Sequence, residues 1–83
     1  MRKLKLTVFE GPKSGDNGIL GVSLSEALSN DYCTHIVAQA DNPFRQTMFW
    51  GHYFRDREEA ETDYKKRVDY MVKHNYVIKT EIE

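Results

Sequence analysis

The chain has 83 residues, of which 40% are hydrophobic and 30% are charged, and its formal net charge is −1. This length predicts one domain with a thin core, and the composition excludes a coiled coil and a disordered chain. The near-neutral charge provides no global field that would attract nucleic acid or an anionic membrane. Cys33 is the single cysteine, and no apolar run is long enough to span a membrane, so we expect a cytoplasmic protein.

The first residues predict a strand followed by a loop. Leu4, Leu6 and Val8 alternate with polar residues, which is the pattern of a strand with one buried face, so we expect a strand over residues 2–9. Residues 10–18 are rich in glycine, proline and asparagine, which favour turns, and they predict a surface loop.

The next segment has two interpretations. Ser23 and Glu26 have the spacing of a capping box, in which each side chain binds a free backbone N–H of the other residue. This spacing predicts a short helix over residues 24–29. A strand through residues 19–24 is the alternative, because a helix of one or two turns is marginal without tertiary support.

A hairpin is expected in the middle of the chain. Residues 32–40 are rich in β-branched and aromatic side chains, and the Asp-Asn-Pro sequence at residues 41–43 is a turn signal. A second aromatic segment follows at once. Residues 32–40 and 45–54 therefore predict two antiparallel strands.

A long amphipathic helix gives the clearest local signal. It begins at Asp56, whose carboxylate can cap the free N–H groups, and it ends at Asn75, which favours the left-handed conformation. Residues 76–82 then alternate again and predict a last strand at an edge of the sheet. The apolar residues that recur at helical spacing are Ala60, Tyr64, Val68, Met71 and Val72.

The predicted order is strand, short helix, strand, strand, long helix and strand, which is the βαββαβ order of ferredoxin-like folds. The first helix is short for such a fold. A small antiparallel sheet of three or four strands, packed on one long C-terminal helix, is therefore the alternative. Both arrangements are α+β folds, and both place residues 1–83 in a single domain.

The strand over residues 45–54 has large apolar side chains on both faces. One helix covers only one face of a sheet. Unless the loop over residues 10–22 covers the other, we expect Phe49, Tyr53 and His35 to lie in an exposed patch that binds a partner. Burial of both faces by loop or dimer contacts is the alternative. Strict alternation gives Met48, Trp50, His52 and Phe54 on one face and Thr47, Phe49, Gly51 and Tyr53 on the other.

The start of the long helix is acidic. Carboxylates at a helix N-terminus complement the positive end of the helix dipole, so they serve first for capping and solubility. They can also dock onto a basic groove of a protein partner. The residues of this acidic patch are Glu58, Glu59, Glu61 and Asp63.

No catalytic or metal-binding signature accompanies these elements. Cys33 and His35 share a strand face, and His52 could lie near them, but this spacing matches no closed zinc site and no fourth ligand is apparent. Side chains two residues apart in a strand stand about 7 Å apart, too far for a nucleophile and its base. We therefore expect no enzyme, no cofactor and no metal.

These features favour a non-enzymatic protein-binding module. In size it resembles the phage and mobile-element accessory proteins that inhibit a larger host complex, including anti-CRISPR proteins. This analogy of size, which no motif supports, implies a protein partner such as a nucleic-acid-processing complex and no membrane. The alternative function is a single-stranded nucleic-acid-binding domain, in which bases stack on the aromatic strand. The charge for that function would come from Arg2, Lys3, Lys5 and Arg45.

Overall fold

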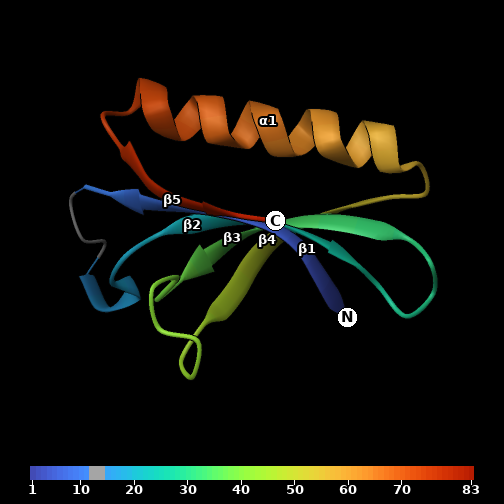
Figure 1. The fold of residues 1–83 in the computed structure, drawn as a ribbon, viewed down its shortest axis with the longest axis horizontal. Helices are drawn as coiled ribbons and strands as arrows, with labels where there is room; N and C mark the ends of the chain where they lie inside the picture. The colour runs from blue at the N-terminus through green and yellow to red at the C-terminus, as the bar shows by residue number, and fades with distance from the viewer. Residues whose placement is uncertain (12–14) are drawn as a thin grey trace.

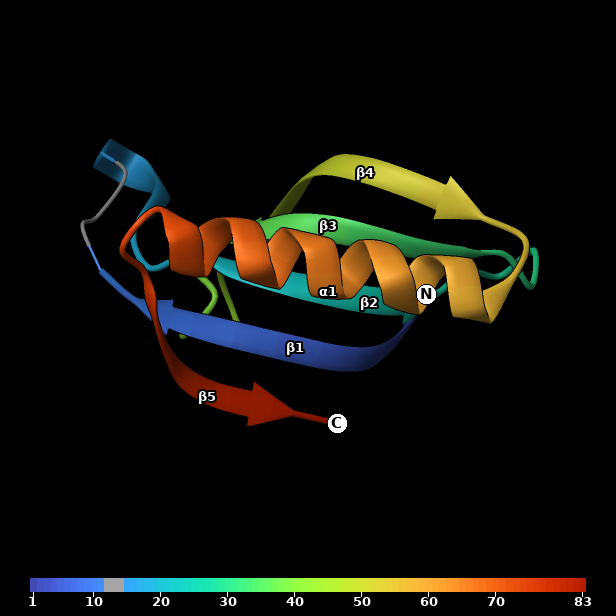
Figure 2. The ribbon, with the colours of Figure 1, turned by 90° about the horizontal axis from the view of Figure 1, so that it is seen from above.

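The computed structural model describes residues 1–11 and 15–83, which form a five-stranded antiparallel sheet with one helix on one face (Figures 1 and 2). The α+β class is confirmed, with more strands than the three or four expected. The elements are β1 (Arg2–Glu10), the 3-10 turn η1 (Gly15–Asn17), β2 (Gly21–Glu26), β3 (Tyr32–Ala38), β4 (Thr47–Phe54), α1 (Arg57–Lys73) and β5 (Val77–Ile82).

The strand order is β4-β3-β2-β1-β5, and every neighbouring pair is antiparallel. The first four strands form a meander, in which each strand pairs with the next one in the chain. α1 then lies lengthwise over the middle of the sheet, nearly along the strand direction, and links β4 at one edge to β5 at the other (Figure 2). This topology differs from the βαββαβ order, because the described residues between β1 and β2 contain only the turn η1.

The short helix predicted over residues 24–29 is wrong, and the alternative strand is present as β2. Val22 and Leu24 are fully buried beneath α1, whereas Ser23 and Ser25 point to the opposite face. Pairing with β1 and β3 on both sides supplies the backbone hydrogen bonds that a capping box would have provided. Tertiary pairing therefore outweighs the local capping signal.

The ends of α1 agree with the sequence prediction. The Asp56 carboxylate accepts a hydrogen bond from the backbone N–H of Glu58 at 3.0 Å. At the other end, Asn75 has a φ of 71°, and the backbone N–H of Tyr76 reaches back to the carbonyl of Met71 at 3.1 Å. This bond satisfies a free carbonyl of the last turn and directs the chain into β5.

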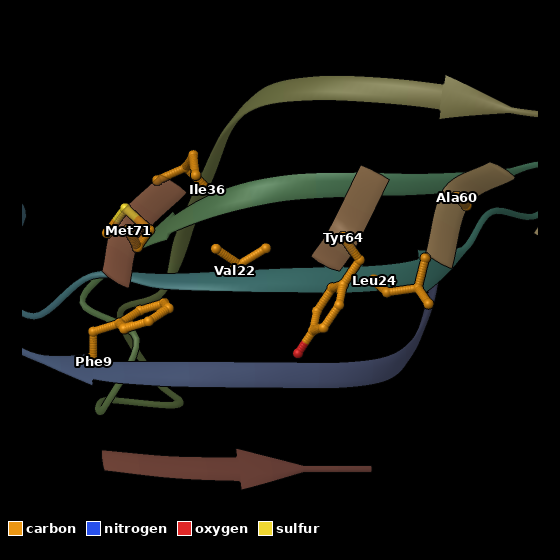
Figure 3. Packing of buried hydrophobic residues seen from close by; sticks show 7 residues of the cluster. All are labelled: Phe9, Val22, Leu24, Ile36, Ala60, Tyr64 and Met71. Atoms are coloured by element: carbon orange, nitrogen blue, oxygen red, sulfur yellow. The ribbon is translucent and has the colours of Figure 1, made fainter. Parts of the chain in front are cut away.

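The main core lies between α1 and the sheet (Figure 3). Tyr64 extends from α1 over β2 towards β1, where its hydroxyl forms a hydrogen bond with the Thr7 hydroxyl. This bond satisfies two polar groups inside an otherwise apolar layer. The buried members of the core are Phe9, Val22, Leu24, Ile36, Ala60, Tyr64 and Met71.

On the opposite face, the loop over residues 39–46 lies below the sheet in Figure 1, and its Ala40 packs with Leu6, Val8 and Val37. Ala40 packs directly over Gly21, where an added Cβ would lie 2.8 Å from the Ala40 Cβ. The Gln46 side chain donates to the Ala40 carbonyl at 2.9 Å and accepts from Lys3 Nζ at 2.6 Å. Residues 10–22 were the cover that the sequence analysis considered as an alternative to exposure; of these, Ile19 packs on this face, and residues 12–14 lie outside the described part of the chain.

The strict alternation predicted for β4 is wrong because the strand contains a bulge. Thr34 pairs with His52 and Ile36 pairs with Phe49, so two residues of β4 lie opposite the single residue His35. The extra residue reverses the facing of everything before it. Phe49 consequently faces α1, while Tyr53 faces the other side of the sheet.

Candidate functional site

Trp50 is the most unusual residue of the structure. It lies in the bulge of β4 with a φ of 55°, and its side chain is 73% exposed. A left-handed conformation costs a residue other than glycine roughly 1–3 kcal/mol, so the surrounding structure must hold it in place. Bulges of this kind redirect a side chain, and here the redirected side chain is a large aromatic ring facing solvent.

A network of hydrogen bonds from α1 holds the bulge. Arg67 donates through Nη2 to the Trp50 carbonyl and through Nε to the Asp63 carboxylate at 3.3 Å. The same Asp63 oxygen accepts from the Thr34 hydroxyl at 2.6 Å and lies 3.0 Å from His52 Nδ1. Asp63 therefore connects the helix to both strands at this edge of the sheet.

The electrostatics of Asp63 fit this role. Partial burial would raise the pKa of its carboxyl group, but hydrogen bonds from Thr34 and His52 and the charge of Arg67 lower it further than burial raises it. The pKa of Asp63 thus lies below its ordinary value. The carboxylate stays ionised and keeps Arg67 directed at the bulge.

A groove of about 420 Å³ runs beside Trp50 between α1 and β4. Phe49 packs edge-to-face against Trp50 with ring centroids 4.9 Å apart, and Tyr70, 60% exposed, stacks on His74 at 4.1 Å. The groove is mainly apolar, with Arg67 and His52 at its border. We call it the aromatic groove, and its apolar lining consists of Leu20, Ile36, Phe49, Trp50, Tyr70 and Met71.

A second hollow of about 400 Å³ lies nearer the N-terminus of α1. Glu58 and Glu59 are exposed there, and within the described residues neither carboxylate has a side-chain partner. Of the described residues that line it, Lys66 is the one cation. We call it the acidic hollow, and it is lined by Phe54, Asp56, Glu58, Glu59, Thr62, Asp63 and Lys66.

The aromatic and histidine residues predicted to form a patch are separated in the structure. Phe49 lies in the aromatic groove, half-buried on the α1 side. Tyr53 is 64% exposed on the opposite face, where it packs edge-to-face against His35 at 5.9 Å. His35 itself is 6% exposed, and burial lowers its pKa, assisted by the charges of Arg67 and His52. The three side chains therefore do not share one surface.

The acidic patch predicted on α1 also divides. Glu58 and Glu59 face the acidic hollow, and Asp63 is engaged in the network described above. Glu61 lies on the other side of the helix, where its carboxylate accepts from Lys5 Nζ at 3.0 Å and this hydrogen bond lowers its pKa. Glu58 and Glu59 thus remain as the carboxylates available to a partner.

The residues considered for chemistry do not converge. Cys33 is fully buried, and burial raises the pKa of its thiol, which disfavours the reactive thiolate. His52 pairs with Thr34 on the α1 side, whereas Cys33 and His35 face the other side. Among the residues that the structure describes, no group of three or more His, Cys, Asp or Glu side chains could hold a metal ion.

Several residues of the aromatic groove were missed by the sequence analysis, namely Trp50, Arg67 and Tyr70. Trp50 was assigned to a face by alternation alone. The signal that could have identified it is Gly51, because a glycine inside a strand often marks a bulge. An added Cβ at Gly51 would lie 2.7 Å from His35 Nε2, so this position accepts little besides glycine.

No protein-family model, curated protein or solved structure matches this chain. Among the described residues, no helix has the length and apolar character needed to cross a membrane. The interpretation of the site therefore depends on the geometry of the chain itself.

Proposed function

We propose that the protein is a non-enzymatic protein-binding module that uses the aromatic groove as its contact surface. In this proposal it binds and inhibits a larger complex in the cytoplasm, in the manner of phage accessory proteins such as anti-CRISPR proteins. The observation that supports it best is Trp50, an exposed ring on a left-handed backbone beside an apolar groove. Tryptophan, tyrosine and arginine are the residues that most often dominate binding energy at protein interfaces, and all three line this groove.

The residue type at the left-handed position of β4 supports a binding role. A fold that only needed a bulge in β4 would place glycine at the left-handed position, because glycine adopts it without cost. Here the left-handed position carries tryptophan, and the glycine follows it at position 51. An exposed ring obtained at this cost is expected to have a use in the bound state.

Single-stranded nucleic-acid binding is the second candidate, and it has less support. A stacking platform needs successive rings on one surface. The two rings expected to form it, Phe49 and Tyr53, lie on opposite sides of the sheet. The exposed rings of Trp50 and Tyr70 keep this function open to a direct test.

The test uses a tagged protein and a nuclease-treated lysate of its host. We expect a stoichiometric protein complex to be captured by the wild type and by Tyr53→Ala, and to be lost with Trp50→Gly. Glycine fits the left-handed backbone, so this variant keeps its fold, which circular dichroism verifies. Capture that survives Trp50→Gly but fails with Tyr53→Ala would contradict the proposed surface. Quenching of Trp50 fluorescence by an oligothymidylate, abolished at high salt, would favour nucleic acid instead.

A further inference from the structure

The aromatic groove and the acidic hollow lie along the same seam between α1 and β4. His52 and Phe54 of β4 line the two hollows on one side, and successive turns of α1 line them on the other. On α1, Glu59 marks the acidic hollow and Tyr70 marks the aromatic groove. Eleven residues separate them, which at about 1.5 Å per residue is roughly 16 Å along the helix.

From this geometry we propose that the partner presents an extended segment carrying an apolar or aromatic anchor and, about five residues away, a Lys or Arg. An extended chain advances about 3.3 Å per residue, so five residues match the separation of roughly 16 Å. The anchor occupies the aromatic groove beside Trp50. The cation lies in the acidic hollow near Glu58 and Glu59. This inference depends on the proposed function and specifies the chemistry of the partner.

The charge of the acidic hollow selects a cation. Asp63 is already neutralised by Arg67, and Asp56 caps the helix, so these two carboxylates are not available. Glu58 and Glu59 are left without a side-chain partner among the described residues. Lys66 is the one cation among the described lining residues, so Glu58 and Glu59 together leave a negative charge in the hollow that attracts a Lys or Arg of the partner.

The bulge also determines how the segment is recognised. β4 is an edge strand, and a regular edge would let a peptide extend the sheet through backbone hydrogen bonds. Here Trp50 has a left-handed φ, and its carbonyl already accepts from Arg67. Sheet extension is thus interrupted at the centre of β4. Recognition by side chains, one in each hollow, is the mode that remains.

The test begins with the selection of random displayed peptides that bind the immobilised full chain. The peptides have about twelve residues, which is long enough to span both hollows and leave flanking residues. We expect enrichment of an apolar or aromatic residue with a Lys or Arg four to six positions away. An enriched peptide is then synthesised and titrated against the protein. Trp50 is the only tryptophan of the chain, so a blue shift of its emission reports occupation of the aromatic groove directly.

Paired charge variants separate the two hollows. Glu58→Gln with Glu59→Gln should weaken the peptide about five- to tenfold and reduce its salt dependence, since each exposed ion pair contributes up to about 1 kcal/mol. The control, Glu10→Gln with Glu81→Gln, makes the same charge change at exposed residues of β1 and β5 and should leave the affinity unchanged.

The outcomes that contradict the inference differ from those that contradict the proposed function. The inference is wrong if peptides without a basic residue are enriched, or if the peptide affinity is unchanged in Glu58→Gln with Glu59→Gln. In either case, a protein complex that depends on Trp50 would still support the proposed function. If Trp50→Gly also leaves the captured complex intact, the function itself is wrong. Peptides enriched in acidic residues would overturn the assignment of the acidic hollow.

Discussion

The two faces of the sheet are buried by different means. On the α1 side, large side chains such as Phe9, Leu24 and Tyr64 fill the space beneath one helix. On the opposite side, Gly21 leaves room for Ala40 of the loop over residues 39–46, which packs together with Leu6, Val8 and Val37. A single helix covers the middle of its face and leaves the margin beside β4 open. The candidate site is therefore at that margin, between the layers.

The largest effect is expected from a larger side chain on the loop-covered face. In Gly21→Val the new Cβ would lie 2.8 Å from both the Ala40 Cβ and the Thr7 carbonyl oxygen, and neither can yield easily. We expect a loss of about 3 kcal/mol in the free energy of unfolding, measured by urea denaturation.

The matched control on the same strand and face is Ser23→Ala. The Ser23 hydroxyl is buried without a hydrogen-bond partner in the described structure, so its removal should be neutral or stabilise by up to about 1 kcal/mol. A large loss in Ser23→Ala, with little loss in Gly21→Val, would show that Ala40 of the loop does not pack closely against Gly21.

On the α1 side, Asp63→Asn should destabilise the protein by about 2 kcal/mol, because it leaves Arg67 without its ion pair and weakens the bonds to Thr34 and His52. Urea denaturation measures the loss. Glu59→Gln, one turn earlier on the exposed side of the helix, is the control and should change stability little.

The same carboxylate predicts a dependence on acid. The pKa of Asp63 is lower in the folded protein than its ordinary value of 3.8. Its stabilisation is thus complete above the unfolded pKa and is lost as the pH falls from about 4 through the folded pKa. The free energies of unfolding of the wild type and of Asp63→Asn, measured by urea denaturation, should therefore approach each other as the pH falls from about 5 to about 3. If the difference in free energy of unfolding between the two proteins does not change with pH, Asp63 is not an ionised carboxylate that stabilises the fold.

The loop-covered face should respond to milder acid through His35. Burial lowers its pKa below the ordinary value of 6.5, so the unfolded chain takes up a proton that the folded protein excludes. Stability is complete above 6.5 and falls below it, by at most about 1.4 kcal/mol per pH unit. His35→Gln should remove this part of the slope. Resonances of the His35 ring that titrate at or above the ordinary value would contradict its burial in the neutral form.

Local sequence patterns predicted the secondary structure correctly where it depends on residues within one element, as in α1. There, Asp56 and Asn75 mark both ends correctly, since capping depends on residues close in sequence. Local patterns gave the wrong secondary structure where pairing with other strands determines it. The capping-box spacing of Ser23 and Glu26 predicted a helix, but pairing with β1 and β3 made a strand.

The candidate site was harder to predict than the fold because one bulge rearranges it. With strict alternation, Phe49 and Tyr53 share a face; with the extra residue in β4, Phe49 joins the aromatic groove and Tyr53 lies on the other side. No local pattern shows that Arg67, seventeen residues along the chain from Trp50, binds its carbonyl. Such a contact depends on how α1 packs over the sheet.

The smallest expected change in stability is also the sharpest test of the bulge. In an ordinary strand, alanine is more stable than glycine by about 0.5–1 kcal/mol, and we expect this order at Tyr53, so Tyr53→Ala should be more stable than Tyr53→Gly. At Trp50 the left-handed φ reverses the order, because alanine keeps the strain that glycine lacks. Trp50→Gly should therefore be about 1 kcal/mol more stable than Trp50→Ala and close to the wild type. If urea denaturation ranks alanine above glycine at both positions, Trp50 is not held in the left-handed conformation, and the bulge does not explain the exposure of its ring beside the aromatic groove.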